Sequence, residues 1–396
     1  MAGSKAANGR SSIYRDGNGR WHGYVSFGAD AVGSRRRKHV RGTTKREVAE
    51  KVDRLERQRS GGLTGGPSTT VGQWLEAWID YRSMTVRPST LRGYRIDRSH
   101  IERELGTVKL DRLTPAHIDG LWSGVLASGA GAATCAHVRR TLSAALTTAV
   151  DRGLIVRNPV RLSPPPRYDP EEVDPLSEAE ARRVLAAAAN DRNGVRWSVA
   201  LALGLRQGEA LGLRWEDVDL EARQIRVRQQ LQHLQWRHGC DGRCGRTPGR
   251  CPSRVGGGPV LAPVKSRAGR RQIAIPQPMV EQLRTHQARQ AGERLRAGSM
   301  WQGWGLVFSE EDGSPIRSEF DSRQWHRLLE RAGVRQARLH DARHTAATLL
   351  LVQGVPTGVA MRILGHADPK MLSRYSHLVE QAQRDAADRM GTALWG

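Results

Sequence analysis

The chain has 396 residues and a formal net charge of +23, so its length predicts two or three domains and its charge a polyanionic partner, most simply nucleic acid. A solvated basic surface is the alternative reading of the charge alone. The chain has only four cysteines and a polar N-terminus, which argues against a disulfide-rich secreted protein. It has no long apolar run, which argues against a membrane protein, so we expect a soluble, cytoplasmic chain.

The N-terminal segment alternates polar and apolar residues between glycine turns. Residues 12–41 predict a three-stranded antiparallel sheet, and residues 43–59 predict a helix with Val48, Val52 and Leu55 at helical spacing. Residues 1–66 contain 15 Lys or Arg and 6 Asp or Glu. We expect the third strand to bind DNA, because strands can read a groove, although a small β appendage that binds nothing is the alternative. The proposed DNA-binding residues are Arg35, Arg36, Arg37, Lys38 and Arg41.

The middle of the chain predicts a helical domain after a glycine-rich linker at residues 60–67. Helices are expected at residues 71–82, 88–104 and 132–152, with another that starts at Thr114 and Pro115. A proline-rich linker at 163–175 follows.

The C-terminal part opens with Ser177 and Glu180, which are spaced as a capping box. We expect a helix at 196–205, strands at 218–227 and 229–235, and a hairpin at 260–275 that completes one small sheet. Further helices are expected from Pro278, around His340, Gly358 and Met371, and at 379–390.

Four polar side chains recur between the apolar stretches near the C-terminus. His340 and Arg343 are three residues apart and share one face of a predicted helix. His366 follows a Leu-Gly turn, and Tyr375 lies nine residues later. Two histidines, an arginine and a tyrosine suggest a site that handles phosphate with a phenolic nucleophile, since tyrosine can form covalent intermediates.

These motifs, His-x-x-Arg-His-Thr, then Leu-Gly-His, then Tyr, resemble the C-terminal signature of the tyrosine recombinases, the phage-integrase family. The segment 204–215 resembles that family's first arginine motif, with Arg206 in the place of the arginine and Glu209 three residues later. The segment 263–276 resembles the hairpin that carries the family's lysine, here Lys265. Five elements in the family's order make the resemblance strong over residues 70–390 and loose over 1–66.

The resemblance implies a multidomain protein that is mainly α with small antiparallel sheets (α+β). It implies an arm-type DNA-binding domain and linker at 1–66, a helical SAM-like core-binding domain at 67–162, a linker at 163–175, and a catalytic domain at 176–396. It also implies a homotetramer that binds double-stranded DNA at core and arm sites, in the cytoplasm with the nucleoid, with an accessory directionality factor and no membrane partner.

The implied reaction joins a 3′ phosphate to Tyr375 and then transfers it to a 5′ hydroxyl, which integrates or excises a mobile element without ATP or a catalytic metal. Arg206 and Arg343 would bind the non-bridging oxygens, and Lys265 would protonate the leaving oxygen. His340 and His366 would hydrogen-bond the phosphate or move the tyrosine proton, and Glu209 would support the arginines. Each of these residues taken alone could instead be a surface or packing residue.

The segment 233–254 reads as an insertion in the sheet. His238, Cys240, Cys244 and Cys251 could form a structural Cys3His zinc site, because a loop rich in Gly, Arg and Pro has no core of its own. The alternative is a hairpin tip with free thiols. Cys135 is expected to be a buried packing residue of a helix.

Two other functions stay open at this point. A type IB topoisomerase-like enzyme would use similar chemistry to relax DNA as a monomer, and the N-terminal module and terminal helix argue against it. A non-catalytic DNA-binding protein on the same scaffold is the other, and the complete set of motif residues argues against that.

Overall fold

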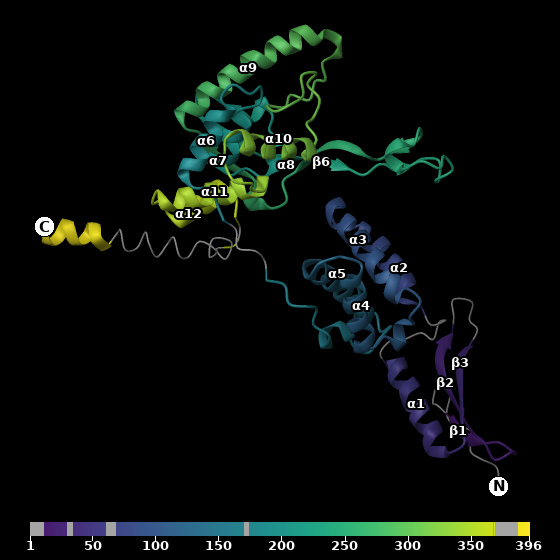
Figure 1. Ribbon diagram of the computed structural model, residues 1–396. Helices are drawn as coiled ribbons and strands as arrows, with labels where there is room; N and C mark the ends of the chain where they lie inside the picture. Colours follow the sequence, from purple (N-terminus) through teal and green to yellow (C-terminus); the bar gives the residue numbers. More distant parts are fainter. Residues whose placement is uncertain (1–11, 30–34, 61–68, 170–173, 367, 369–386) are drawn as a thin grey trace. The chain divides into compact units, whose positions relative to one another are not determined.

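The computed structural model describes residues 12–29, 35–60, 69–169, 174–366, 368 and 387–396, in two compact units divided between Glu171 and Glu172 (Figure 1). Each unit is described by itself. The described helices include none with the length and apolar character needed to cross a membrane.

The first unit begins with a small sheet backed by one helix. Strand β1 pairs with β2, and β2 pairs with β3, all antiparallel. Val48, Val52 and Leu55 of the helix pack with Val25 in a small buried core. The predicted sheet and helix are therefore confirmed. The elements are β1 (Ser12–Arg15), β2 (Trp21–Ala29), β3 (Arg35–Gly42) and α1 (Lys45–Ser60).

A helical bundle with its own core follows. The predicted helix that starts at Pro115 is confirmed, and the Thr114 hydroxyl accepts the His117 backbone N–H as its N-cap. Two tryptophans on one face of the first helix are buried, and each indole N–H finds an acceptor. Trp74 donates to the carbonyl of Ala145, and Trp78 donates to the Thr148 hydroxyl, both at 3.0 Å. The helices are α2 (Val71–Ser83), α3 (Pro88–Leu105), α4 (Pro115–Ala127) and α5 (Ala132–Asp151).

The second unit is built mainly from helices around three buried clusters. The predicted capping box at Ser177 and Glu180 is present, and Trp197 packs against Trp325 in one of the clusters. The predicted helix around Met371 and most of the one at 379–390 lie outside the described residues. Residues 387–395 are also helical. The labelled helices are α6 (Glu178–Ala188), α7 (Val195–Leu203), α8 (Gln207–Leu211), α9 (Gln277–Ala297), α10 (Ser318–Arg331), α11 (Leu339–Val352) and α12 (Thr357–Leu364).

The strands of this unit correct the sequence prediction in two ways. The single strand expected at 218–227 is a hairpin, because the Asp219 carboxylate accepts the Ala222 N–H in a turn and Arg223 has φ 51°. The single sheet expected is divided into separate sheets in the order β10-β5-β4 and β6-β9. The strands are β4 (Val218–Asp219), β5 (Gln224–Val227), β6 (Gln229–Leu234), β9 (Gly258–Pro263) and β10 (Arg271–Ala274).

The β6–β9 hairpin projects from the helices of the second unit (Figure 1). A short ladder continues it beyond the two main strands, formed by β7 (Arg237–His238) and β8 (Arg254–Val255). The insertion predicted from the sequence therefore forms the end of this hairpin.

Candidate active site and metal cluster

Arg206 is held at the start of α8 by a reciprocal pair of contacts. Its Nη1 donates to Glu209 Oε1 at 2.7 Å, while its backbone N–H donates to the other carboxylate oxygen at 3.2 Å. Its Nη2 donates to the carbonyl of Gly365 at 3.3 Å. The side chain is 38% exposed, whereas that of Glu209 is 3% exposed. A buried carboxylate thus orients a guanidinium that still reaches the surface.

Arg271 is a member of this network that the sequence analysis missed. Its Nη2 donates to Glu209 Oε2 at 3.0 Å, and its Nε donates to the carbonyl of Ile363 at 2.6 Å. Burial raises the pKa of Glu209, but the charges and hydrogen bonds of Arg271 and Arg206 outweigh it and lower the pKa overall. Glu209 is therefore a carboxylate that braces two arginines.

Arg343 joins the C-terminal ends of two other helices. It is 5% exposed, and its Nη1 donates to the carbonyl of Gly204 at 2.5 Å, just after α7. Its Nη2 donates to the carbonyl of Leu364 at the end of α12. Helix C-terminal carbonyls lack partners within the helix and favour a cation, which explains why a buried arginine is stable here.

His340 and His366 lie in the positive field of these arginines. Burial, Arg343 and Arg206 lower the pKa of His366 to about 4. Desolvation by the surrounding protein, followed by Arg343, lowers the pKa of His340. The Nδ1 atom of His366 is buried and has no hydrogen-bond partner among the described residues. Both rings are thus neutral near pH 7 in the free protein.

The position of Lys265 is described, whereas that of Tyr375 is not. Lys265 is exposed in the loop between β9 and β10, and the backbone of Ala268 in this loop approaches Gly365. Tyr375 lies outside the described residues. The structure therefore brings together Arg206, Arg343, His340, His366 and Glu209 and adds Arg271, while Lys265 lies on a neighbouring loop.

A cavity of about 370 Å³ opens beside His340 and Arg343. Arg196 and Arg338 also line it, and none of its lining residues is acidic. Arg196 is paired with Asp321 and Arg338 with Asp341, each at 3.0 Å, so these carboxylates offset much of the positive charge beside the cavity.

The predicted DNA-binding residues of the first unit lie on β3. Arg37, Lys38 and Arg41 are exposed, and Arg35 pairs with Ala29 near the start of the strand; Arg36 is its neighbour on the same strand. Beside them, rings stack across the sheet, with centroids of Tyr24 and His39 4.5 Å apart. A sheet with exposed cations and aromatic rings is typical of a nucleic-acid surface.

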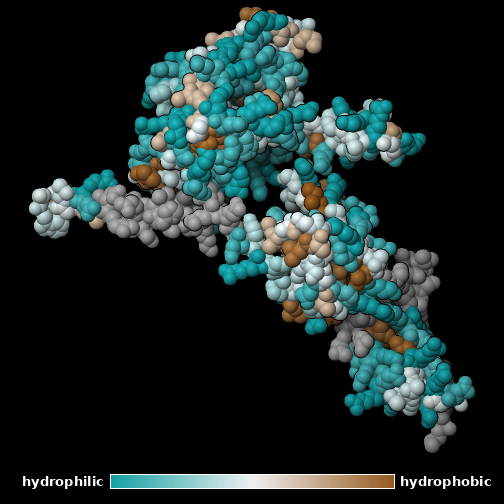
Figure 2. Space-filling model, in the orientation of Figure 1, coloured by the Kyte–Doolittle hydropathy of each residue, from teal (hydrophilic) through white to brown (hydrophobic). Residues whose placement is uncertain are grey.

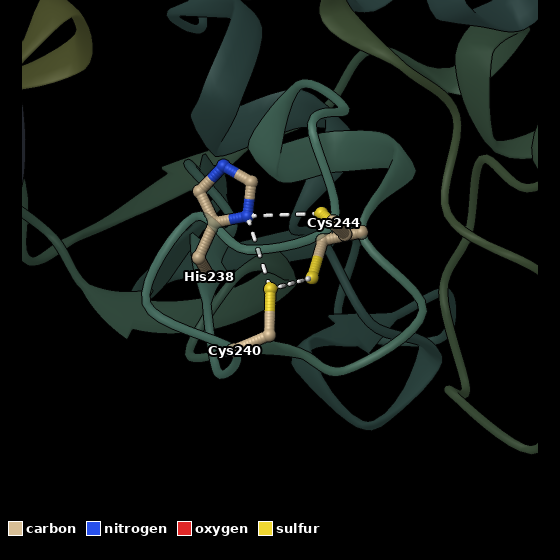
Figure 3. Close-up of side chains that lie close together, drawn as sticks. His238, Cys240 and Cys244 are labelled. Carbon is tan, nitrogen blue, oxygen red and sulfur yellow. Dashed lines mark hydrogen bonds between the residues drawn. The ribbon is translucent and has the colours of Figure 1, made fainter.

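The four predicted zinc ligands converge at the end of the hairpin. Their ligand atoms lie within 4.8 Å of one another. His238 Nδ1 lies 3.7 Å from Cys240 Sγ and 3.5 Å from Cys244 Sγ, and the Sγ atoms of Cys240 and Cys251 are 3.5 Å apart. Figure 3 shows His238, Cys240 and Cys244 pointing toward one another. A hydrogen bond from the Cys244 backbone, then one with Cys251, lowers the pKa of Cys240 to about 6. Cys135 is buried in α5, as predicted.

Two protein-family models match parts of the chain. The phage integrase family model matches residues 260–382, and the model of the phage integrase N-terminal SAM-like domain matches residues 70–123. The first match begins within β9 and so covers the candidate site without Arg206 and Glu209, and the second covers the helical bundle from α2 into α4.

Individual relatives extend the similarity to the whole chain. An integrase of Saccharopolyspora erythraea is 39% identical, covering 98% of this chain and 98% of its own length. A protein of Caldanaerobacter subterraneus subsp. tengcongensis described as tyrosine recombinase XerC-like is 26% identical, covering 96% of this chain and 98% of its own length.

A solved structure shares the fold. The Tn1549 transposon integrase in complex with a circular intermediate DNA has a TM-score of 0.64 and 20% sequence identity, covering 82% of this chain and 100% of that chain. Together with the described elements, this similarity confirms the mainly α architecture with small antiparallel sheets.

Proposed function

The chain belongs to the phage integrase family of tyrosine recombinases, and we propose from this premise that it cuts and rejoins double-stranded DNA at specific sites, which integrates or excises a mobile element. The observation that carries this function is the convergence of Arg206 and Arg343. One is held by a buried carboxylate and the other by two helix-end carbonyls, and both lie close enough to His366 to lower its pKa.

The first step is a transesterification at phosphorus. The oxygen of Tyr375 attacks the scissile phosphorus, a bond forms between them, and the bond from phosphorus to the 5′ oxygen breaks. Arg206 and Arg343 donate to the non-bridging oxygens, where charge accumulates in the pentacoordinate state. The 5′ oxygen takes a proton from the Lys265 ammonium group. A 5′ hydroxyl of a partner strand then reverses the step and rejoins the DNA.

The histidines fit two different roles. A pKa of about 4 makes His366 a poor base in the free protein, but an incoming phosphate would raise that pKa and favour hydrogen bonding from the ring. His340 lies on the same face of α11 as Arg343 and faces the cavity, where it can bind a phosphate oxygen or take the tyrosine proton. ATP is not needed, because the phosphotyrosine bond keeps the energy of the broken bond, and Arg206 and Arg343 supply the charge stabilisation that a catalytic metal would otherwise give.

The other parts of the chain fit binding roles. The β3 cations would bind arm sites and the α2–α5 bundle would bind the core site, with domains at 1–66, 67–162 and 176–396. Exchange between two duplexes cuts four strands, and each subunit has one nucleophile, so the active complex is a homotetramer. An accessory factor would set direction, and the protein would act on DNA in the cytoplasm.

The cluster at the hairpin end would hold structural zinc. A tetrahedral site with Zn–S near 2.3 Å and Zn–N near 2.05 Å requires ligand separations of about 3.6–3.8 Å. Three of the six separations between the ligand atoms are 3.5–3.7 Å, close to this requirement, and all six are within 4.8 Å. The set of His238, Cys240, Cys244 and Cys251 leaves no open position, so the metal would stabilise the loop and take no part in catalysis.

Covalent trapping tests the function. The protein is incubated with a nicked duplex that carries its candidate core site, in EDTA and without ATP, and the adduct is mapped by mass spectrometry. We expect DNA attached to Tyr375 and no adduct with Tyr375→Phe, which should still bind the duplex. On a closed supercoiled plasmid that carries the same site, relaxation of supercoils without strand exchange would indicate a topoisomerase-like enzyme. No adduct on bound DNA would leave only a DNA-binding scaffold.

A further inference from the structure

On the basis of the DNA-processing function above, we propose that residues 236–255, the tip of the β6–β9 hairpin, form a metal-dependent contact for the sugar–phosphate backbone of duplex DNA. The tip adds a second region of substrate contact to the catalytic domain, separate from the arginines that surround the scissile phosphate.

The tip is strongly basic. It contains five arginines, all exposed, and one carboxylate, Asp241. A zinc ion with three thiolates and one imidazole adds a single negative charge, so the tip stays positive when the metal is bound. Figure 2 shows the projecting hairpin covered mainly by hydrophilic residues. The five arginines are Arg237, Arg243, Arg246, Arg250 and Arg254.

The positions of these arginines depend on the metal ligands. Arg243 precedes Cys244 and donates to the carbonyl of Cys240 at 3.1 Å, and Arg250 precedes Cys251. Within residues 236–255, Cys251 is the only buried residue, so this part of the chain has no apolar core to order it. Loss of the metal would release the arginines into many conformations and weaken any shared contact with phosphates.

The chemistry of the tip favours nucleic acid over another protein. Protein interfaces are centred on clusters of buried aromatic or aliphatic anchors. The tip exposes one large aliphatic side chain, Val255, and its tryptophan, Trp236, is covered by the Arg254 guanidinium at 4.6 Å. Dispersed arginines without an exposed aromatic anchor match the regular negative charge of a duplex, which releases counterions when it is neutralised.

The hairpin also sets the reach of the tip. The paired positions run from Gln229 with Pro263 to Leu234 with Gly258, which corresponds to about 20 Å of strand. Lys265 follows Pro263 by two residues. The tip can therefore contact backbone about six base pairs from the position of Lys265.

Salt-dependent DNA binding by the full-length protein tests this contact. The affinity for a fluorescein-labelled duplex of random sequence is measured over a series of NaCl concentrations. The test variant is Arg246→Gln with Arg250→Gln, and the matched control is Arg294→Gln with Arg296→Gln, two exposed arginines of α9. Cys244→Ser tests the metal, and native mass spectrometry gives the zinc content of each protein.

Affinity falls as salt rises, so the slope of log affinity against log salt is negative. We expect the tip variant to reduce the magnitude of this slope by up to about 1.8, since each lost phosphate contact removes about 0.9. The zinc content of the tip variant should be unchanged, and the control should keep the wild-type slope. Cys244→Ser should contain little zinc and should also show a slope of smaller magnitude. An unchanged slope in the tip variant, or an equal loss in the control, would overturn the contact. A zinc-free Cys244→Ser protein with the wild-type slope would overturn its dependence on metal.

The salt-dependence experiment tests the tip contact independently of the catalytic assignment of Tyr375. A reduced slope with no Tyr375 adduct would reject the cleavage chemistry and retain the contact. An adduct with an unchanged slope would retain the chemistry and reject the contact.

Discussion

Arg271 and Glu209 form a buried ion pair, with Nη2 of the arginine 3.0 Å from Oε2 of the carboxylate and both side chains at most 5% exposed. Glu209 also holds Arg206, so the buried pair lies directly behind the exposed arginine of the site. This relationship places Arg271 in a positioning role, because it contacts the carboxylate that orients Arg206.

Arg271→Ala should reduce both stability and strand cleavage. Arg271→Ala removes one of the two cations paired with the buried Glu209 carboxylate. The cost should stay below the value of about 3–5 kcal/mol expected for a fully unpaired buried charge, and Arg206 loses its fixed orientation. Urea unfolding gives the stability, and the rate of Tyr375 adduct formation is measured under conditions where the variant is folded. Arg270→Ala, at an exposed neighbouring position, is the control. Wild-type adduct rates in folded Arg271→Ala would contradict the positioning role.

Arg271 also shows what the sequence could not provide. Arg206, Arg343, His340 and His366 fall in motifs of short spacing and family order, and the structure brings all four together. The partners of Arg271 are 62 residues before it and 92 residues after it, so local patterns contain no signal for the pairing. Its position in the arginine-rich hairpin segment marked it only as one basic residue among several.

The strand prediction failed for a local reason. Apolar residues alternate at 218, 220 and 222 and then change phase to 225 and 227, and a hydrogen bond from Ala222 to the Asp219 side chain ends the first strand. Turns that depend on one side chain are weaker signals than the helical spacing of Val48, Val52 and Leu55, which identified α1 correctly.

Gly204→Ala should displace Arg343. Gly204 has φ 58°, and an added Cβ would lie 2.6 Å from a methyl carbon of Leu364. The left-handed backbone costs a non-glycine residue about 1–2 kcal/mol, and overpacking adds about 1–3 kcal/mol. Because the Gly204 and Leu364 carbonyls both accept from Arg343, cleavage should fall with stability.

Gly333→Ala is the matched control for this substitution. Gly333 has φ 60°, and an added Cβ would meet nothing within 4 Å. Gly333→Ala should lower the free energy of unfolding only by the cost of the left-handed backbone. It should not reduce Tyr375 adduct formation in the folded protein. Equal losses of stability in the two variants, measured by urea unfolding, would contradict the role of the contact with Leu364.

His366 should make the protein less stable in acid. Its pKa falls from 6.5 to about 4 on folding, so between these values the unfolded chain binds more protons than the folded one. The free energy of unfolding therefore rises with pH across this window and falls as the solution is acidified. His366→Gln should flatten this dependence, whereas His137→Gln, at an exposed position on α5, should not. Urea unfolding at several pH values measures it, and parallel curves for wild type and His366→Gln would contradict the prediction.

Loss of zinc should disorder the tip of the β6–β9 hairpin and should have a smaller effect on the rate of Tyr375 adduct formation. Cys244→Ser removes one of four converging ligands, so elemental analysis should find zinc in the wild-type protein and in Cys135→Ser, but little in Cys244→Ser. Proteolysis should then cleave the chain between residues 235 and 257, because closure by the metal replaces the missing core. The rate of Tyr375 adduct formation should change less than the rate of proteolysis, since no step of the proposed reaction uses the metal.

A wild-type protein that contains no zinc after purification in metal-supplemented medium would contradict the metal assignment. Equal proteolysis of the wild-type and Cys244→Ser proteins would show that the ligands do not order the tip.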